Sequence, residues 1–207
     1  SEYYIARLSV SKMKYSKKIF SKKKMSEVEV AFRNYLEKYP NGRLAPSVAT
    51  TWKKFNTNMQ KSDIIYLIRA YYLAGMYKEA KELMESVKDD EVWALKVSTA
   101  YATKDFATVY NLTEVGVEKY SDNVTDEDYN RAVNNYLSMF DSKQQPHYVS
   151  KLLSNAKGDK KVSLWDLKCK GVNAKGRLSC YEDLYKNFPN SEYSENALFQ
   201  VLMLSVK

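Results

Sequence analysis

The chain has 207 residues, a formal net charge of +8 at pH 7, six glycines, four prolines, two cysteines and one histidine. A single histidine leaves too little material for a His-rich metal site or a Ser-His-Asp arrangement. The glycines form neither a P-loop nor a dinucleotide-binding motif. We therefore expect no enzyme activity of its own, with no catalytic residue, no metal site and no cofactor. No stretch reaches the eighteen or so apolar residues of a membrane span.

Helix-forming residues fill long stretches, and the few Gly and Pro residues separate them. In chain order we expect helices at 25–38, 46–58, 62–75, 77–88, 91–103, 105–119, 126–140, 174–187 and 193–206. Segment 144–172 is expected to hold two more, interrupted at 155–159. The sequence therefore predicts an all-α fold.

Positive charge is concentrated at the N-terminus. Residues 1–60 carry thirteen Lys or Arg against four Asp or Glu, whereas residues 61–207 carry twenty against twenty-one. Seven of the thirteen lie close together: Lys12, Lys14, Lys17, Lys18, Lys22, Lys23 and Lys24. Apolar and aromatic residues alternate with them, a pattern that suits an anionic partner such as a membrane, a cell-wall polymer or an acidic protein. A solvated lysine face is the other reading, and nucleic acid is disfavoured because no recognised binding module accompanies the lysines.

One sequence pattern occurs twice. Residues 32–45 read FRNYLEKYPNGRLA, and residues 181–194 read YEDLYKNFPNSEYS. Proline ends a helix because it lacks an N–H, and Asn and Ser then supply turn and cap chemistry for the next helix. The copies are 149 residues apart, close to four units of 37, and a shorter third copy lies at 119–123. A period in the mid-thirties is typical of a helical-hairpin solenoid.

A second pattern lies inside the unit at 64–84. Leu67, Tyr71, Gly75, Tyr77 and Ala80 resemble the signature of a tetratricopeptide repeat, in which a small residue such as Ala80 allows two helices to cross closely. The following unit lacks both the glycine and the small crossing residue. We expect a superhelical stack of antiparallel helix hairpins, a tetratricopeptide-like α-solenoid.

Three regions are expected in this array, which we take to be continuous and part of a longer protein. Residues 1–60 hold the basic N-terminal helices and the first repeat-like hairpin. Residues 61–124 hold the best-defined repeats. Residues 125–207 hold degenerate repeats that end in an apolar helix.

The Y-P-N-G and F-P-N-S turns resemble those of periplasmic tetratricopeptide-like proteins of the bacterial cell envelope. These include outer-membrane assembly lipoproteins, the cell-division coordinator family and the helical arms of soluble lytic transglycosylases. The resemblance implies a non-catalytic scaffold in the periplasm or cell envelope that binds partner proteins through a concave helical surface. The alternatives are a superhelical arm of a larger cell-wall enzyme, and a cytoplasmic location.

Two cysteines and one helix complete the candidate sites. Cys169 and Cys180 either face each other across a hairpin as a disulfide, which would fit an oxidising compartment, or are two buried free thiols. Residues 197–206 are apolar nearly all round, although the last helix of a solenoid should have a polar outer face. We expect an interface, such as that of a homodimer, through Leu198, Phe199, Leu202 and Val206. The other reading is that this helix folds back into a closed core.

Overall fold

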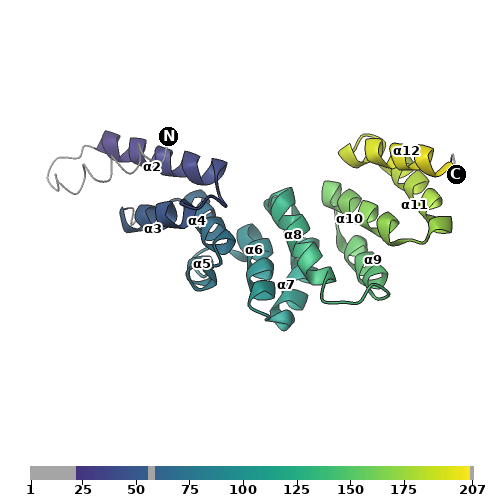
Figure 1. Cartoon of the computed structure of the whole chain (residues 1–207), viewed down its shortest axis with the longest axis horizontal. Coiled ribbons are helices and arrows are strands. Elements are labelled where there is room, and N and C mark those ends of the chain that lie inside the picture. The colour runs from purple at the N-terminus through teal and green to yellow at the C-terminus, as the bar shows by residue number, and fades with distance from the viewer. Residues whose placement is uncertain (1–21, 56–58, 206–207) are drawn as a thin grey trace. The chain divides into compact units, whose positions relative to one another are not determined.

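A computed structural model describes residues 22–55 and 59–205 of this chain, and these residues form eleven α-helices, one short 3₁₀ helix and no strand (Figure 1). The prediction of an all-α fold is confirmed for this part of the chain. The chain divides into two compact units, Ser1–Lys88 and Asp89–Lys207. None of the described helices is long and apolar enough to cross a membrane.

The first unit contains four described helices: α2 (Lys22–Lys38), α3 (Ala45–Phe55), α4 (Lys61–Leu73) and α5 (Tyr77–Met84). Helix α4 packs on α2, α3 and α5, and α2 also packs on α3. The ring of Phe32 stacks on that of Trp52, with centroids 6.0 Å apart, and both side chains are buried. An ion pair supports this core, because Arg33 Nε donates to the buried Asp63 carboxylate at 2.7 Å.

The turn between α4 and α5 is a Schellman motif. The Gly75 N–H bonds to the Tyr72 carbonyl, and the Met76 N–H bonds to the Tyr71 carbonyl. Gly75 has φ of 74°, a left-handed conformation that glycine adopts without steric cost. Ala80 follows on α5 and is fully buried, so a small residue lies where α5 packs on α4.

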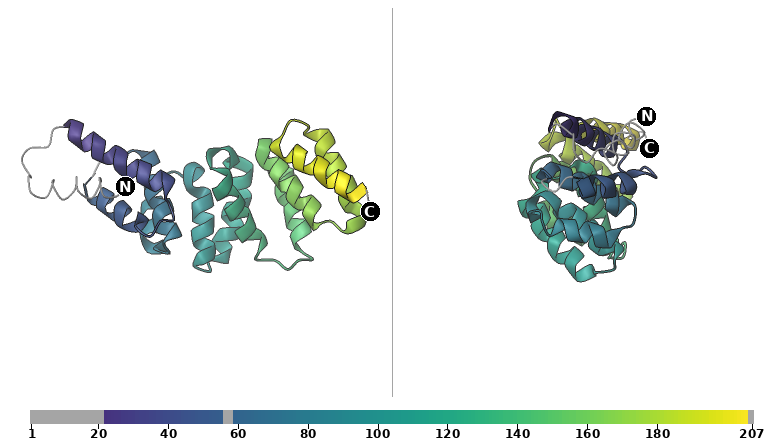
Figure 2. Two further views of the ribbon diagram at one scale, coloured as in Figure 1. Left: turned by 45° about the horizontal axis from the view of Figure 1, so that its top comes forward. Right: turned by 90° about the vertical axis from the view of Figure 1, so that its left-hand side faces the viewer.

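The second unit contains seven described α-helices and one 3₁₀ helix. These are α6 (Asp89–Ala102), α7 (Phe106–Lys119), η1 (Ser121–Asn123), α8 (Asp126–Leu137), α9 (Gln145–Asn155), α10 (Gly158–Gly171), α11 (Ala174–Asn187) and α12 (Glu192–Ser205). Consecutive helices lie side by side: α6 packs on α7, α9 on α10, and α11 on α10 and α12 (Figure 2). Helix α6 also packs on α8.

The turn between α6 and α7 repeats the α4–α5 turn without its glycine. The Lys104 N–H bonds to the Tyr101 carbonyl, and the Asp105 N–H bonds to the Ala100 carbonyl. Lys104 takes the left-handed position with φ of 61°. The sequence did not reveal this second turn because a lysine stands where glycine is expected.

A close crossing also exists between α6 and α7. A Cβ added to Gly116 would lie 2.2 Å from the ring of Trp93. The Trp93 indole N–H donates to the Tyr120 carbonyl at 3.1 Å, and the Trp93 ring meets Tyr129 edge-on at 6.0 Å. Gly116 is therefore a small residue at the α6–α7 crossing, although it lies seven positions beyond Val109, which occupies the position equivalent to Ala80.

The duplicated Pro-Asn pattern forms the same corner twice. In the first copy, the N–H groups of Tyr39, Gly42 and Ala45 bond to the carbonyls of Tyr35, Tyr39 and Gly42. In the second copy, the N–H groups of Phe188, Ser191 and Ser194 bond to the carbonyls of Leu184, Phe188 and Ser191. Every donor and acceptor differs by the same 149 positions, so the two copies share these backbone hydrogen bonds as well as the Pro-Asn pattern.

The predicted helices agree with the observed ones, apart from α2, which begins at Lys22 rather than residue 25, and two helices that end early. Residues 56–58, at the predicted end of the helix at 46–58, lie outside the described residues. Helix α5 ends at Met84 rather than residue 88, and α8 ends at Leu137 rather than residue 140. The hydroxyl groups of Ser86 and Ser138 donate to the Leu83 and Asn135 carbonyls just past these ends. Such side chains compete with the backbone for carbonyl acceptors and favour helix termination.

Candidate protein-interaction surface

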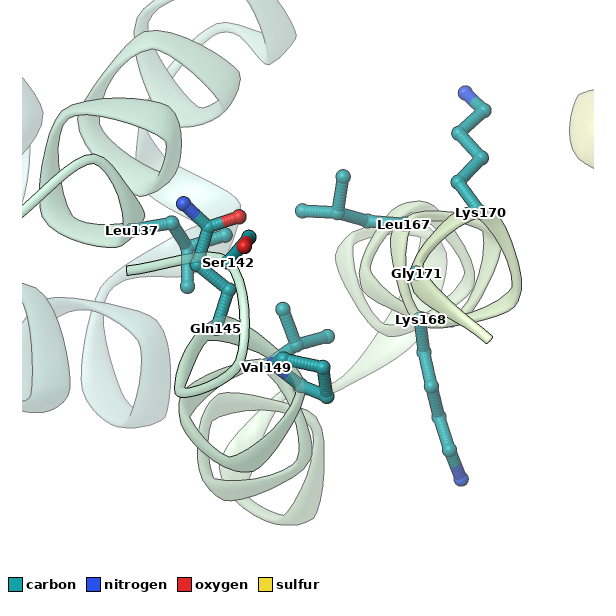
Figure 3. Close-up of a pocket in the computed structure, with 9 residues that line it drawn as sticks. Leu137, Ser142, Gln145, Val149, Leu167, Lys168, Lys170 and Gly171 are labelled. Atoms are coloured by element: carbon teal, nitrogen blue, oxygen red, sulfur yellow. The ribbon is translucent and has the colours of Figure 1, made fainter. Parts of the chain in front are cut away.

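A groove of about 260 Å³ lies between α8, α9 and α10 in the second unit. Its apolar lining comes from Leu137, Pro146, Val149 and Leu167, and its polar lining from Ser142, Gln145, Lys168, Lys170 and Gly171. Figure 3 shows Leu137, Gln145 and Val149 on one side and Leu167 on the other, with the two lysine side chains extending away from α10. The groove thus has apolar walls, and two lysines of α10 lie at its margin.

The loop before α9 is held by its own side chains. The Asp141 carboxylate accepts hydrogen bonds from the Lys143 and Gln144 N–H groups, both at 2.9 Å. Gln145 Nε2 then donates to the Phe140 carbonyl at 3.1 Å. These bonds position the first turn of α9, where proline is tolerated because its missing N–H has no helical partner. One wall of the groove is therefore set by local polar contacts.

The opposite wall is the end of α10, and a disulfide joins it to α11. Cys169 and Cys180 are bonded in the structure, with their Cα atoms 5.4 Å apart. Lys170 Nζ pairs with the Asp166 carboxylate at 2.6 Å, and this hydrogen bond raises the pKa of Lys170. Arg177 donates to the Lys170 and Val172 carbonyls, which satisfies groups that the end of α10 leaves open.

A cluster of aromatic and charged side chains joins α7, α8 and α9. Its members are Tyr110, Glu114, Tyr136, Phe140, Tyr148 and Lys151. Phe140 stacks on Tyr148 with centroids 3.5 Å apart, and Tyr136 meets both rings edge-on. We call these six residues the aromatic cluster.

Glu114 is the polar centre of the aromatic cluster. Its Oε1 accepts hydrogen bonds from Lys151 Nζ at 2.6 Å and from the Tyr136 hydroxyl at 3.0 Å. Burial raises the pKa of Glu114, but the hydrogen bonds from Lys151, Tyr136 and Tyr110 outweigh it, and the net pKa is lowered. The hydrogen bond to Glu114 raises the pKa of Lys151, while burial raises the pKa of Tyr136. Glu114 therefore stays ionised and ties the three helices together.

The residues singled out from the sequence lie in different places. Lys12, Lys14, Lys17, Lys18 and Val206 lie outside the described residues, and Lys22, Lys23 and Lys24 lie in α2. His147 is exposed on α9, with its ring edge-on to Tyr148 at 5.2 Å. Leu198, Phe199 and Leu202 are exposed on α12.

The groove and the aromatic cluster were not predicted from the sequence. Their residues come from different helices and lie up to 41 positions apart in the sequence, as in the hydrogen-bonded pair of Lys151 with Tyr110. The density of tyrosines was a signal for such a cluster, but it did not indicate which residues pair. Within the described ranges, no group of three or more His, Cys, Asp or Glu could hold a metal ion.

Comparison with protein-family models, with curated proteins and with solved structures finds no match for this chain.

Proposed function

We propose that this chain is a tetratricopeptide-like stack of helix hairpins that binds partner proteins as a scaffold in the bacterial cell envelope. The repeated Schellman turn at Gly75 and Lys104, the small crossing residues Ala80 and Gly116, and the duplicated Pro-Asn corner support the repeat assignment. Repeat arrays of this kind bind partners on extended helical surfaces.

The groove between α8, α9 and α10 is the observation that carries the proposed function. It offers apolar walls from Leu137, Val149 and Leu167 in a volume that suits one large side chain. Lys168 and Lys170 lie at its margin, and Lys143 is exposed on the loop beside it. The preferred partner segment would carry a bulky apolar side chain flanked by carboxylates.

The disulfide supports the proposed location. Disulfides of this kind persist in oxidising compartments such as the bacterial periplasm, whereas reducing systems in the cytosol keep cysteines as free thiols. Beside the groove, the disulfide also fixes the end of α10 against α11. A scaffold in the envelope would thus keep one wall of its binding site in place covalently.

Fluorescence anisotropy with synthetic peptides and the full chain tests this proposal. The first peptide is acidic with a central Phe, the second has Ala in place of that Phe, and the third replaces the acidic residues with Lys. We expect the first to bind in the micromolar range or weaker, and the other two at least about tenfold more weakly, as a lost anchor or charge complement implies.

Two variants locate the binding site. Leu167→Glu places a charge in the groove, and Lys168→Glu reverses a charge at its margin, so both should weaken binding of the acidic peptide. Val115→Glu is the matched control, because Val115 is an exposed apolar residue of α7 that does not line the groove. Equal binding by all three variants, or no preference for the acidic Phe peptide, would contradict the proposal.

A further inference from the structure

Helix α12 presents an apolar face that the described helices leave open. Leu198, Phe199, Leu202 and Met203 are 40%, 56%, 58% and 51% exposed. These spacings of one and four residues place all four on the same side of a helix. We call them the α12 face. Within the described residues α12 packs on α10 and α11, which contact its other side.

The helix that follows the first Pro-Asn corner, α3, shows how the equivalent face is packed in this protein. With the offset of 149, Ala49 and Thr50 of α3 correspond to Leu198 and Phe199 of α12. In α3, Ala49 is fully buried, and the Thr50 hydroxyl lies 3.1 Å from that of Tyr71 on α4. Helix α4 therefore covers the half of this face that Ala49 and Thr50 form in the first copy.

The second copy extends the same face with apolar residues. Lys53 and Lys54 of α3 are exposed and charged, but their equivalents in α12 are Leu202 and Met203. Exposed apolar patches of this kind mark interaction sites. Because a helix covers the equivalent of Leu198 and Phe199 in the first copy, a helix with an apolar stripe is the occupant expected for the α12 face.

We propose that the occupant is α12 of a second copy of this chain, packed antiparallel about a two-fold axis. The α12 face is symmetric about its centre, so Phe199 of one copy would meet Leu202 of the other, and the converse contact follows. No charged residue occurs in 196–205, so two copies meet without like-charge repulsion. Glu192 and Glu195 lie in the first turn of α12, and antiparallel packing keeps the two acidic ends apart.

The area of the α12 face indicates how strongly two copies should associate. Four large side chains at about half exposure amount to roughly 400 Å² per copy. A pair would bury about 800 Å² in total, less than the roughly 1,200–2,000 Å² of a standard stable interface. The dimer should therefore be weak and reversible, and should form as the protein concentration rises.

Sedimentation velocity of the full chain from about 1 µM to about 500 µM is the experiment. We expect the wild-type chain to shift from monomer to dimer across this range. Phe199→Lys and Leu202→Glu should each remain monomeric, with unchanged helix content by circular dichroism because both positions are exposed. Val115→Glu, a charge introduced at an exposed apolar site on α7, should dimerise like the wild type.

Mixing the two monomeric variants tests the antiparallel geometry. In a mixed pair, the lysine introduced by Phe199→Lys in one copy would face the glutamate introduced by Leu202→Glu in the other, and the second contact would be the native pair of Leu202 with Phe199. The mixture should therefore dimerise although neither variant does alone. A wild-type chain that stays monomeric throughout, an open-ended series of larger species, or a mixture that does not dimerise would overturn the proposal.

Discussion

Trp93 and Gly116 show how a single absent Cβ sets the distance between two helices. The indole ring lies over the Gly116 backbone and is held by its hydrogen bond to the Tyr120 carbonyl. The sequence identified Gly75 and Ala80 because they match a known repeat spacing. It did not identify Gly116, because its role depends on a tryptophan 23 positions earlier that packs there only in the folded chain.

The Gly116→Ala substitution should destabilise the protein. The new methyl group would overlap the Trp93 ring, and both residues are buried, so relief requires moving a helix or an indole. We expect a loss of about 1–3 kcal/mol in the free energy of unfolding, as for other overpacked cores, measured by urea titration. Gly171→Ala is the matched control, because no atom lies within 4 Å of its added Cβ. Equal stability of the two variants would contradict this account of the crossing.

Lys104 occupies a left-handed turn position that could not be predicted from its residue type. Its left-handed φ of 61° is a conformation that costs a non-glycine residue roughly 1–2 kcal/mol. The hydrogen bonds of the turn that surrounds it are made by the backbone. A sequence pattern that requires glycine therefore misses the turn, although the backbone repeats it.

At the scale of elements, the aromatic cluster connects three helices by contacts that no local pattern encodes. Helix positions were predictable from the local composition and from the Gly, Pro and Ser residues between helices, because these residues end or begin a helix within a few positions. The pairing of Glu114 with Lys151 joins α7 to α9 across 37 positions. Only the packing of those helices determines it.

Acid should weaken this connection. The pKa of Glu114 in the folded chain lies below its ordinary value of 4.5. A lowered carboxyl pKa contributes stability above the unfolded value, and that contribution is lost as the pH falls through the folded pKa. Glu114→Gln should therefore lower the Tm at pH 7 by about 2–4 °C, and the difference should shrink towards about pH 3.

Glu118→Gln is the control for this experiment, because Glu118 is exposed one turn further along α7. Its Tm should follow that of the wild type at both pH values. A Glu114→Gln difference that is the same at both pH values would show that the ionised carboxylate is not the cause.

At the scale of the whole molecule, charge is distributed unevenly along the chain. Residues 1–60 carry a formal net charge of +9, and residues 61–207 carry −1. Binding to an anionic surface should therefore depend on the N-terminal lysines and fall with salt, because exposed charges are screened beyond about 8 Å at physiological ionic strength.

Vesicles that contain anionic lipid provide the measurement. Reversing Lys17, Lys18, Lys22 and Lys23 to Glu should abolish co-sedimentation at low salt and leave the Tm nearly unchanged. The control reverses four exposed lysines elsewhere: Lys78, Lys157, Lys175 and Lys186. Four reversals remove eight charges from +8, so both variants have a formal net charge of zero and only the position of the change differs. Equal retention of both would favour a solvated lysine face.

The duplicated corner has a consequence for ancestry. Its three backbone hydrogen bonds occur in both copies, and in the second copy the Ser191 and Ser194 hydroxyls also donate to the Phe188 carbonyl. Gly42 and Ala45 in one copy are Ser191 and Ser194 in the other, without loss of the turn. A corner formed by backbone hydrogen bonds can keep its shape while its side chains are substituted. A duplication in such a protein would therefore stay recognisable in the backbone hydrogen bonds after the sequence similarity is lost.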